Sequence, residues 1–287
     1  MSDLSVGQVK TCEAKLPTDL FLRACREGLS CIRPLTGQAR LRDEGGWNYG
    51  TAQAPSYAAF ARMRALLAVM ECEALGPRRV LEVAAGDASL AASLEARTGC
   101  EVWANDLRAE HVRVGLGVCS NGSRIHLLPG NVFDLDAAIG PFDLVVACEV
   151  IEHVAHGVDF IRKLASLTTP GGRLLITTPN GNHFRNRLPA YYDIPDHRVL
   201  EKDQFKPDAD GHLFLIRPHE IYRMADEAGV TVERLALWGS PFLTGHGGLR
   251  RLGGAIPARV CLALERLTNL SPFRETLSFA MSAVLRR

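Results

Sequence analysis

The chain has 287 residues, of which 47% are hydrophobic and 23% charged, a composition that is ordinary for one large globular domain or a domain with an appendage. Because 33 basic residues face 32 acidic ones, the net charge of +1 gives no electrostatic reason to expect a membrane or nucleic-acid partner, although a local basic patch remains compatible with it. No stretch reaches the roughly 18 apolar residues that span a bilayer, and the first ten residues lack the apolar core of a signal peptide. The eight cysteines form no CxxC pair. We therefore predict a cytoplasmic protein with free thiols.

The amino-terminal segment is irregular and polar up to about residue 55, and we expect it to form an arm or cap. Residues 57–75 then carry apolar side chains at helical spacing, and Gly76-Pro77 stops the helix. We therefore predict two parts, an arm at 1–55 and a folded domain at 56–287.

Short apolar segments alternate with helical segments over the next hundred residues. The predicted strands are 79–84, 101–106, 124–130, 142–149 and 173–179. The predicted helices are 88–99, 107–118, a short one at 133–139, and 150–168. Strands that are apolar throughout and alternate with helices indicate a parallel sheet that is covered on both faces.

The rest of the chain breaks this rhythm twice. Residues 180–215 form a long polar connection, and a connection of this length inside a compact domain is usually functional. After a helix at 217–229 and a strand at 230–239, residues 240–271 read as a glycine-rich loop and a helix. Residues 276–287 are compatible with a strand or a helix, and we favour a last, antiparallel strand because it would complete the sheet. We predict a doubly wound, Rossmann-like sheet of seven mostly parallel strands, with 180–215 and 240–275 as insertions that form a lid or the substrate side.

Candidate ligand residues follow the predicted strands, because an open parallel sheet binds ligands beyond the carboxyl ends of its strands. Gly86 follows the first strand and can adopt backbone conformations that other residues avoid. Asp106 follows the second, about 20 residues later, where a carboxylate can accept hydrogen bonds from ribose hydroxyls. Asn131 and Val132 follow the third, and the phrase CEVIEHV follows the fourth. Each signal alone is weak, since an Asp at a strand end is often only a helix cap. The succession of these residues after four consecutive strands is more specific for a ligand site than any one of them.

These residues resemble the class I S-adenosylmethionine-dependent methyltransferases over about residues 78–239. In VLEVAAGDASL, Glu82 and Gly86 match the family's acidic, glycine-rich loop, while Ala84 and Ala88 replace two glycines and would be strained at positive φ. The G-x-G-x-x-G pattern of dinucleotide-binding proteins is absent. The resemblance implies that S-adenosyl-L-methionine is bound by a set of residues at the strand ends: Glu82, Ala84, Gly86, Asp106, Leu107, Asn131, Val132 and Cys148.

A Glu-x-x-Glu-His phrase follows the fourth predicted strand. Glu149, Glu152 and His153 would share one helix face if the helix has begun by Glu149. Two acids in a first turn are also what a helix dipole favours on its own. We expect His153 to act as base or orienting group toward a substrate hydroxyl, with His212 as the second choice and Glu152 beside them.

The same phrase also resembles the cation site of small-RNA 3′-end 2′-O-methyltransferases and occurs in quinone-biosynthesis O-methyltransferases. In the first case Glu149, Glu152 and His153 would bind a divalent metal together with His212 or His197. We regard this metal as possible but not favoured, because the near-zero net charge argues against an RNA groove.

We thus predict an S-adenosylmethionine-dependent methyltransferase that acts on a small organic molecule at oxygen. Three alternatives stay open: a metal-dependent RNA 2′-O-methyltransferase, a nicotinamide-binding enzyme on a similar sheet, and a non-catalytic S-adenosylmethionine-binding subunit. His183 and His197 lie in the long insertion, where either is a candidate for substrate contact.

Overall fold

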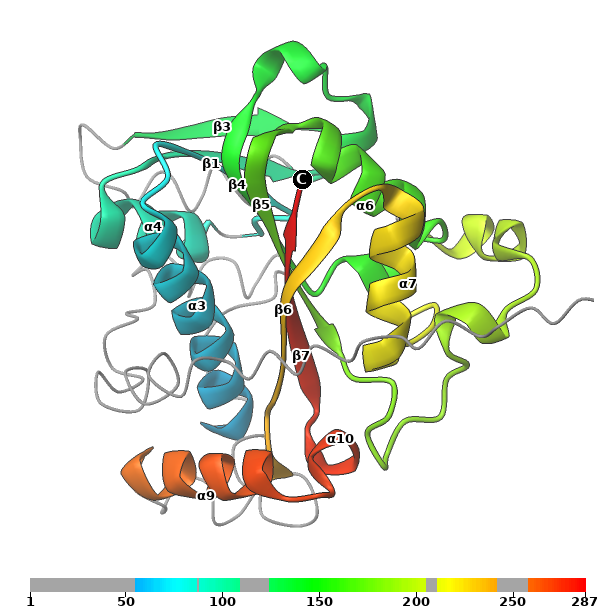
Figure 1. Cartoon of the computed structure of the whole chain (residues 1–287). Coiled ribbons are helices and arrows are strands. Elements are labelled where there is room, and N and C mark those ends of the chain that lie inside the picture. Colours follow the sequence, from blue (N-terminus) through cyan, green and yellow to red (C-terminus); the bar gives the residue numbers. More distant parts are fainter. Residues whose placement is uncertain (1–54, 87, 109–123, 205–210, 242–257) are drawn as a thin grey trace, which may run out of the picture.

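A computed structural model describes residues 55–86, 88–108, 124–204, 211–241 and 258–287. In this part of the chain, seven strands form one sheet with the order β3-β2-β1-β4-β5-β7-β6 (Figure 1). All neighbours are parallel except β7, which runs antiparallel to β5 and β6. The strands are β1 Arg79–Val83, β2 Glu101–Asp106, β3 Ile125–Pro129, β4 Phe142–Cys148, β5 Thr168–Pro179, β6 Thr231–Trp238 and β7 Ala280–Arg286. The predicted fold class, including the antiparallel last strand, is confirmed.

Helices cover both faces of the sheet, as the apolar strands require. On one face, α3 (Pro55–Leu75) and α4 (Ser89–Thr98) pack on side chains such as Val80 and Val102 (Figure 1). On the other face, α6 (Gly157–Ser166) and α7 (Pro218–Ala228) pack on Leu81, Val145 and Ile176. Alternate residues of one strand, such as Val80 and Leu81, therefore belong to two separate cores on the two faces of the sheet.

The structure differs from the prediction most clearly after β4. The predicted helix at 150–168 is instead a 3₁₀ turn, η4 (Ile151–His153), an extended link, and the shorter α6. β5 begins at Thr168, five residues earlier than predicted, because Gly171 adopts φ 79° and lets the strand pass through the Pro-Gly-Gly turn. The helix predicted at 107–118 falls mostly outside the described residues, as does the predicted arm.

The remaining elements are short. The helix predicted at 133–139 consists of two 3₁₀ turns, η2 (Val132–Asp134) and η3 (Ala137–Ile139). The insertion after β5 contains η5 (Tyr191–Asp193) and η6 (His197–Asp203). Before β7 lie α9 (Ala258–Leu270) and α10 (Arg274–Leu277). No helix among the described residues combines the length and the apolar character that a membrane span requires.

Strand register brings the predicted cofactor residues to one edge. Val83 lies opposite Asn105 of β2 and Ala147 of β4, and Asp106 lies opposite Pro129 of β3. The loops after β1, β2, β3 and β4 therefore leave the sheet side by side. The order reverses between β1 and β4, which is the crossover where open parallel sheets bind their ligands.

Candidate active site

The loop after β1 is built on left-handed backbone. Ala84, Gly86 and Ala88 have φ values of 56°, 55° and 56°. Glycine adopts this conformation at little cost, but in an alanine the Cβ crowds the following carbonyl, at about 1–2 kcal/mol per residue. The two alanines therefore hold the glycine-type loop shape under strain, as the sequence comparison with the family's loop implied.

Asp106 links this loop to β2. Its Oδ2 accepts a hydrogen bond from the Gly86 N–H at 2.8 Å, and its Oδ1 accepts one from the Arg108 N–H at 2.7 Å. The second bond is the capping interaction that the sequence also allowed. Asp106 therefore ties the loop after β1 to the end of β2.

The loop after β3 is held by a residue that the sequence reading missed. Asn105 is 2% exposed, and its Nδ2 donates to the carbonyls of Leu128 and Gly130 at 2.8 and 2.9 Å. Asn131 then caps η2, with its Oδ1 accepting from the Phe133 N–H at 3.1 Å. Only the alternation of β2 hinted at Asn105, since an amide at an inward-facing strand position must find polar partners.

The predicted cofactor residues differ in exposure along this edge. Glu82 and Val132 are buried, Gly86 and Asp106 are half-buried, and Ala84 and Leu107 are exposed. Burial raises the pKa of the Cys148 thiol to about 12, so this thiol stays protonated near neutral pH and lines the edge without acting as a nucleophile. The edge is mainly backbone and small side chains, a surface that a flat ligand can approach closely.

Glu149 does not lie where the helical prediction placed it. It has φ 56°, and its N–H donates to the Thr177 carbonyl at 2.9 Å. Its Oε1 accepts from Thr177 Oγ1 at 2.8 Å and lies 3.8 Å from a guanidinium nitrogen of Arg64. Because the left-handed residue interrupts the chain direction, Glu149 does not share a helix face with Glu152 and His153, and that part of the prediction was wrong.

Arg64 is the second residue that sequence reasoning missed. It lies on α3, is 8% exposed, and reaches the loop after β4. Its positive charge also lowers the pKa values of Cys148 and Glu152, although other causes prevail in both. An arginine among apolar neighbours in the middle of a helix was the available signal, because buried guanidinium groups are normally paired.

Glu152 is fully buried. Its Oε2 accepts from Thr178 Oγ1 at 2.9 Å, while no described group lies within hydrogen-bond distance of Oε1. Burial, and secondarily the charge of Glu149, raise the pKa of Glu152 well above its usual value. Burial therefore favours the protonated carboxyl group, and Oε1 is a buried polar atom without a hydrogen-bond partner among the described residues.

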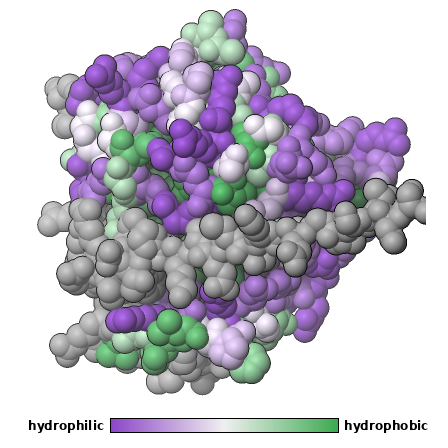
Figure 2. Space-filling view, viewed as in Figure 1, coloured by the Kyte–Doolittle hydropathy of each residue, from purple (hydrophilic) through white to green (hydrophobic). Residues whose placement is uncertain are grey.

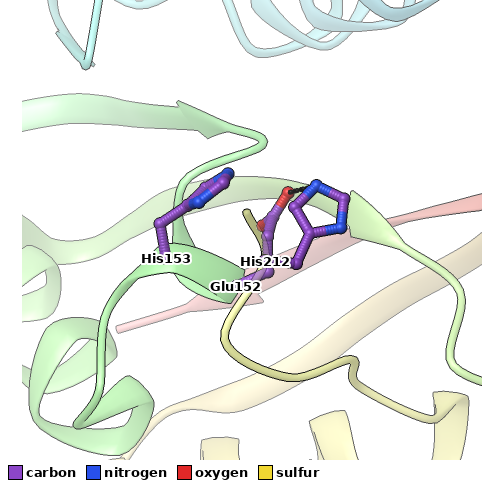
Figure 3. A group of neighbouring side chains, drawn as sticks. All are labelled: Glu152, His153 and His212. Carbon is purple, nitrogen blue, oxygen red and sulfur yellow. Dashed lines mark ion pairs between the residues drawn. The ribbon is translucent and has the colours of Figure 1, made fainter. Parts of the chain in front are cut away.

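Two histidines face this atom (Figure 3). His212 Nε2 lies 4.0 Å from Glu152 Oε1, and the His153 and His212 rings meet edge to face with centroids 5.0 Å apart. Burial lowers the pKa of His212 and raises that of Glu152, so both shifts favour the uncharged forms of this pair. The Leu213 N–H donates to the Glu152 carbonyl at 2.9 Å, which fastens the distant 211–213 segment to η4.

The orientation of His153 is fixed by its backbone partner. Its Nδ1 lies 3.1 Å from the Gly211 carbonyl oxygen. Since a carbonyl only accepts, Nδ1 must be the donor, and in the neutral ring Nε2 then carries the lone pair. The site thus contains an imidazole with a defined basic nitrogen at the carboxyl edge of the sheet.

The other candidate histidines lie elsewhere. His197 stacks on Tyr191, with ring centroids 4.1 Å apart, and its Nε2 is 3.0 Å from the Tyr191 carbonyl. His183 is buried against Phe184 and Phe279. Both belong to the packing of the insertion, and His212 is the insertion histidine that reaches the site.

Three of the four predicted metal ligands come together. One donor atom from each of Glu152, His153 and His212 lies within 4.8 Å of the other two, whereas Glu149 is turned toward Thr177 and Arg64. Carboxylate and imidazole donors suit Zn²⁺, Mn²⁺ or Fe²⁺. The same three groups without a metal form a polar cluster that can move a proton.

Comparisons with known proteins agree on one family. A family model described as "Methyltransferase domain" matches residues 56–235. A ubiquinone biosynthesis O-methyltransferase from Xanthomonas axonopodis pv. citri is 34% identical over 158 residues, which cover 54% of this chain and 63% of that relative, so the match spans less than two thirds of its length. Two solved methyltransferases share the fold. One, from Mesorhizobium loti, has a TM-score of 0.51 and 14% identity, and the match covers 77% of this chain and 96% of that one. The other, phosphoethanolamine N-methyltransferase 2 of Haemonchus contortus, has a TM-score of 0.51 and 15% identity, and the match covers 81% of this chain and 57% of that one.

Proposed function

The chain belongs to the class I S-adenosylmethionine-dependent methyltransferase family, and from this membership we propose that it transfers a methyl group to a hydroxyl oxygen of a small organic molecule. The name of the Xanthomonas relative, an O-methyltransferase, supports oxygen as the acceptor atom. The acceptor lone pair attacks the methyl carbon, the carbon–sulfur bond breaks, and S-adenosylhomocysteine leaves. The hydroxyl proton must go to a base, and the site offers one.

We propose that the loops after β1, β2 and β3 bind the cofactor. Asp106, which also accepts from the N–H groups of Gly86 and Arg108, would accept hydrogen bonds from the ribose hydroxyls, because each carboxylate oxygen can accept more than one. Asn131 and Val132 lie at the adjacent strand end, where an adenine edge would meet the Asn131 amide and the Val132 backbone. The exposed Leu107 supplies an apolar surface for the base, while Glu82, Ala84 and Cys148 line the floor.

The amino-acid part of the cofactor needs a cation for its carboxylate, and we assign this role to Arg64. The guanidinium lies beside Glu149 at the end of β4, next to the β1–β4 crossover. It is largely buried, so its charge acts in a medium that screens it weakly. Glu149, whose Oε1 lies 3.8 Å from a guanidinium nitrogen, would help to hold Arg64 in place.

His153 is our candidate for the base, and the observation that carries the proposal is its hydrogen bond to the Gly211 carbonyl at 3.1 Å. Because Nδ1 donates to that carbonyl, Nε2 is the nitrogen of the neutral ring that can accept a proton. His212 and Glu152 would position the acceptor, because they close the same cluster from the insertion and from η4.

The test measures S-adenosylhomocysteine formation by mass spectrometry, with 3,4-dihydroxybenzoate and other small hydroxylated acids as acceptor probes. His153→Gln should lower kcat by about 10²-fold or more and leave the calorimetric Kd of S-adenosylmethionine unchanged. The matched control is His156→Gln, at an exposed histidine three residues away that pairs with Glu201. If the chain binds the cofactor and methylates no acceptor, the non-catalytic subunit is the correct description.

A second candidate is a metal-dependent form of the same reaction. It is favoured by Glu152 Oε1, a buried atom with no hydrogen-bond partner among the described residues, which lies in a set of three donors. Glu152, His153 and His212 would hold the ion, and when bound it would act as a Lewis acid that acidifies the acceptor hydroxyl. Activity that EDTA abolishes and Mn²⁺ or Zn²⁺ restores would establish this form, whereas activity that is indifferent to chelator rules it out.

A further inference from the structure

Helix α9 is attached to the domain by its polar side. Glu265 is fully buried, and its two carboxylate oxygens accept hydrogen bonds from the N–H groups of Gly239 and Ser240, both at 2.7 Å. Thr268, one turn later, is 6% exposed. Two polar side chains of the helix, Glu265 and Thr268, are thereby buried, and Glu265 fixes the helix to the chain that leaves β6.

The opposite side of α9 is apolar and exposed. Val260, Ala263, Leu267 and Leu270 are spaced by three, four and three residues and so form one stripe along the helix. Val260, Leu267 and Leu270 are 41, 63 and 72% exposed, and Phe273 in the following turn is 66% exposed. Figure 2 shows apolar side chains on the surface over this part of the molecule. A soluble helix normally has the reverse arrangement, so this outer stripe, here called the α9 stripe, calls for an apolar partner.

The charges around the stripe indicate which partner. Residues 242–277 contain five arginines, no lysine and only two acids, Glu265 and Glu275, although the whole chain is nearly neutral. Glu265 is buried, so it offers no counter-charge at the surface. Arg266, within the exposed part of α9, and Arg274, in α10, flank the apolar side chains. The segment is therefore locally cationic, which the balanced total charge concealed.

We propose that the α9 stripe docks on an anionic lipid surface. A helix with an apolar face flanked by arginines lies in the plane of a membrane, with the apolar side chains in the boundary region and the cations on the head groups. A second copy of the chain fits less well, because a symmetric contact would bring the same arginines of both copies together. Such docking is peripheral and is consistent with the lack of a membrane-spanning helix among the described residues.

Co-sedimentation of the full chain with vesicles tests the proposal. We expect binding to vesicles of phosphatidylcholine with a quarter phosphatidylglycerol, much weaker binding to pure phosphatidylcholine, and weakening by added NaCl. Leu267→Glu should reduce binding by about tenfold, and the Leu267→Glu, Leu270→Glu double variant by more, because each change removes apolar contact and adds a repelled charge.

The matched control is Val199→Glu, at an apolar side chain of similar exposure, 57%, in η6. It should bind vesicles like the parent, and all variants should keep the parent's thermal unfolding midpoint. Equal binding of the parent and the double variant overturns the proposal. So does light scattering that shows a dimer which the double variant dissociates, because the stripe would then be a contact between copies. A lower unfolding midpoint confined to the double variant also overturns it, since the chain itself would then cover the stripe.

Discussion

The loops after β1, β2 and β3 and the turn after β4 sit on the same edge of one sheet, yet they are built by different means. In the first three loops, here called the cofactor half, shape comes from backbone: left-handed residues at 84, 86 and 88, and carbonyls and N–H groups held by Asn105 and Asp106. After β4, in what we call the acceptor half, shape comes from titratable side chains that converge from η4 and from residues 211–213.

This difference has a functional meaning. A cofactor that many enzymes share can be recognised by a surface of small residues and fixed polar atoms, which changes little with the substrate. An acceptor requires groups of particular charge and basicity, and these must be desolvated to act. We therefore expect changes in the cofactor half to alter binding, and changes in the acceptor half to alter turnover.

The sharpest test of this separation is Glu152, for which we expect the largest effect. Glu152→Ala should lower kcat by about 10²–10³-fold while the Kd of S-adenosylmethionine stays within about twofold, because the acceptor loses its positioning group. Glu152→Gln should retain much more activity, since its amide oxygen still accepts from Thr178 Oγ1 and burial at this position favours an uncharged group. If Gln is as damaging as Ala, the carboxylate is needed in its charged form, as a metal ligand would be.

The same substitution carries a stability signature. Because burial raises the pKa of Glu152 in the folded protein above the ordinary 4.5, the folded state keeps a proton that the unfolded chain releases. This group's contribution to stability is therefore complete below about pH 4.5 and is lost as the pH rises through the folded-state pKa. Urea unfolding of Glu152→Gln should show a smaller fall in stability between pH 5 and 8 than the parent, and equal slopes would contradict the burial-driven shift.

Asp106 tests the other half. Asp106→Ala removes the acceptors for Gly86 and Arg108 and, in our proposal, for the ribose. We expect the Kd of S-adenosylmethionine to rise by about a hundredfold, with kcat at saturating cofactor within a few fold of the parent. Isothermal titration with 5′-methylthioadenosine should show the same loss, because that ligand keeps the ribose. An unchanged Kd would remove Asp106 from the cofactor site.

The two halves also differ in how far the sequence predicted them. The cofactor half follows from local signals: Gly86 after one apolar strand, Asp106 after the next and Asn131 after the third, all brought together by strand register. Asn105 was missed because its partners, the carbonyls of Leu128 and Gly130, are more than twenty residues away.

For the acceptor half, the sequence named most of the residues that come together but did not predict how they are arranged. Helical periodicity placed Glu149 beside Glu152, but the left-handed backbone at Glu149 interrupts the helix, and no local pattern reveals a positive φ in a glutamate. The sequence left His212 and His197 as alternatives for the further histidine. His212 reaches the site because the neighbouring Leu213 N–H donates to the Glu152 carbonyl, a contact between residues some sixty positions apart. The position of Arg64 within an apolar helix gave a weak signal, but its partner could not be predicted, because Glu149 lies in the turn after β4, far away in the sequence.

Arg64 lies between the two halves, so its effect should be selective and smaller than that of Asp106. Arg64→Gln should weaken S-adenosylmethionine by about tenfold, because one charge-assisted contact to the ligand carboxylate is lost. Binding of 5′-methylthioadenosine, which lacks the amino-acid part, should not change, and Arg64→Lys should fall between the two. The control Arg97→Gln breaks the ion pair between Arg97 of α4 and Glu73 of α3 and should affect neither ligand. Equal losses for both ligands would mean that Arg64 only supports the fold.

The smallest effect that we predict concerns the backbone strain of the cofactor half. Ala84 is exposed and has φ 56°, so Ala84→Gly relieves about 1–2 kcal/mol of crowding and loses almost no packing. Glycine also makes the unfolded chain more flexible, which opposes this gain by about 0.4–1 kcal/mol. The net change in unfolding free energy should be a gain of about 0.5–1 kcal/mol in urea titrations.

The matched control is Ala92→Gly in α4, where the backbone is helical and glycine should cost about 1 kcal/mol. The same chemical change should thus have opposite signs at two positions eight residues apart. A loss at both positions would mean that the loop does not hold Ala84 in the left-handed region. Opposite signs, together with an unchanged kcat in Ala84→Gly, would show that the cofactor half stores its strain in the backbone and that turnover depends on the side chains after β4.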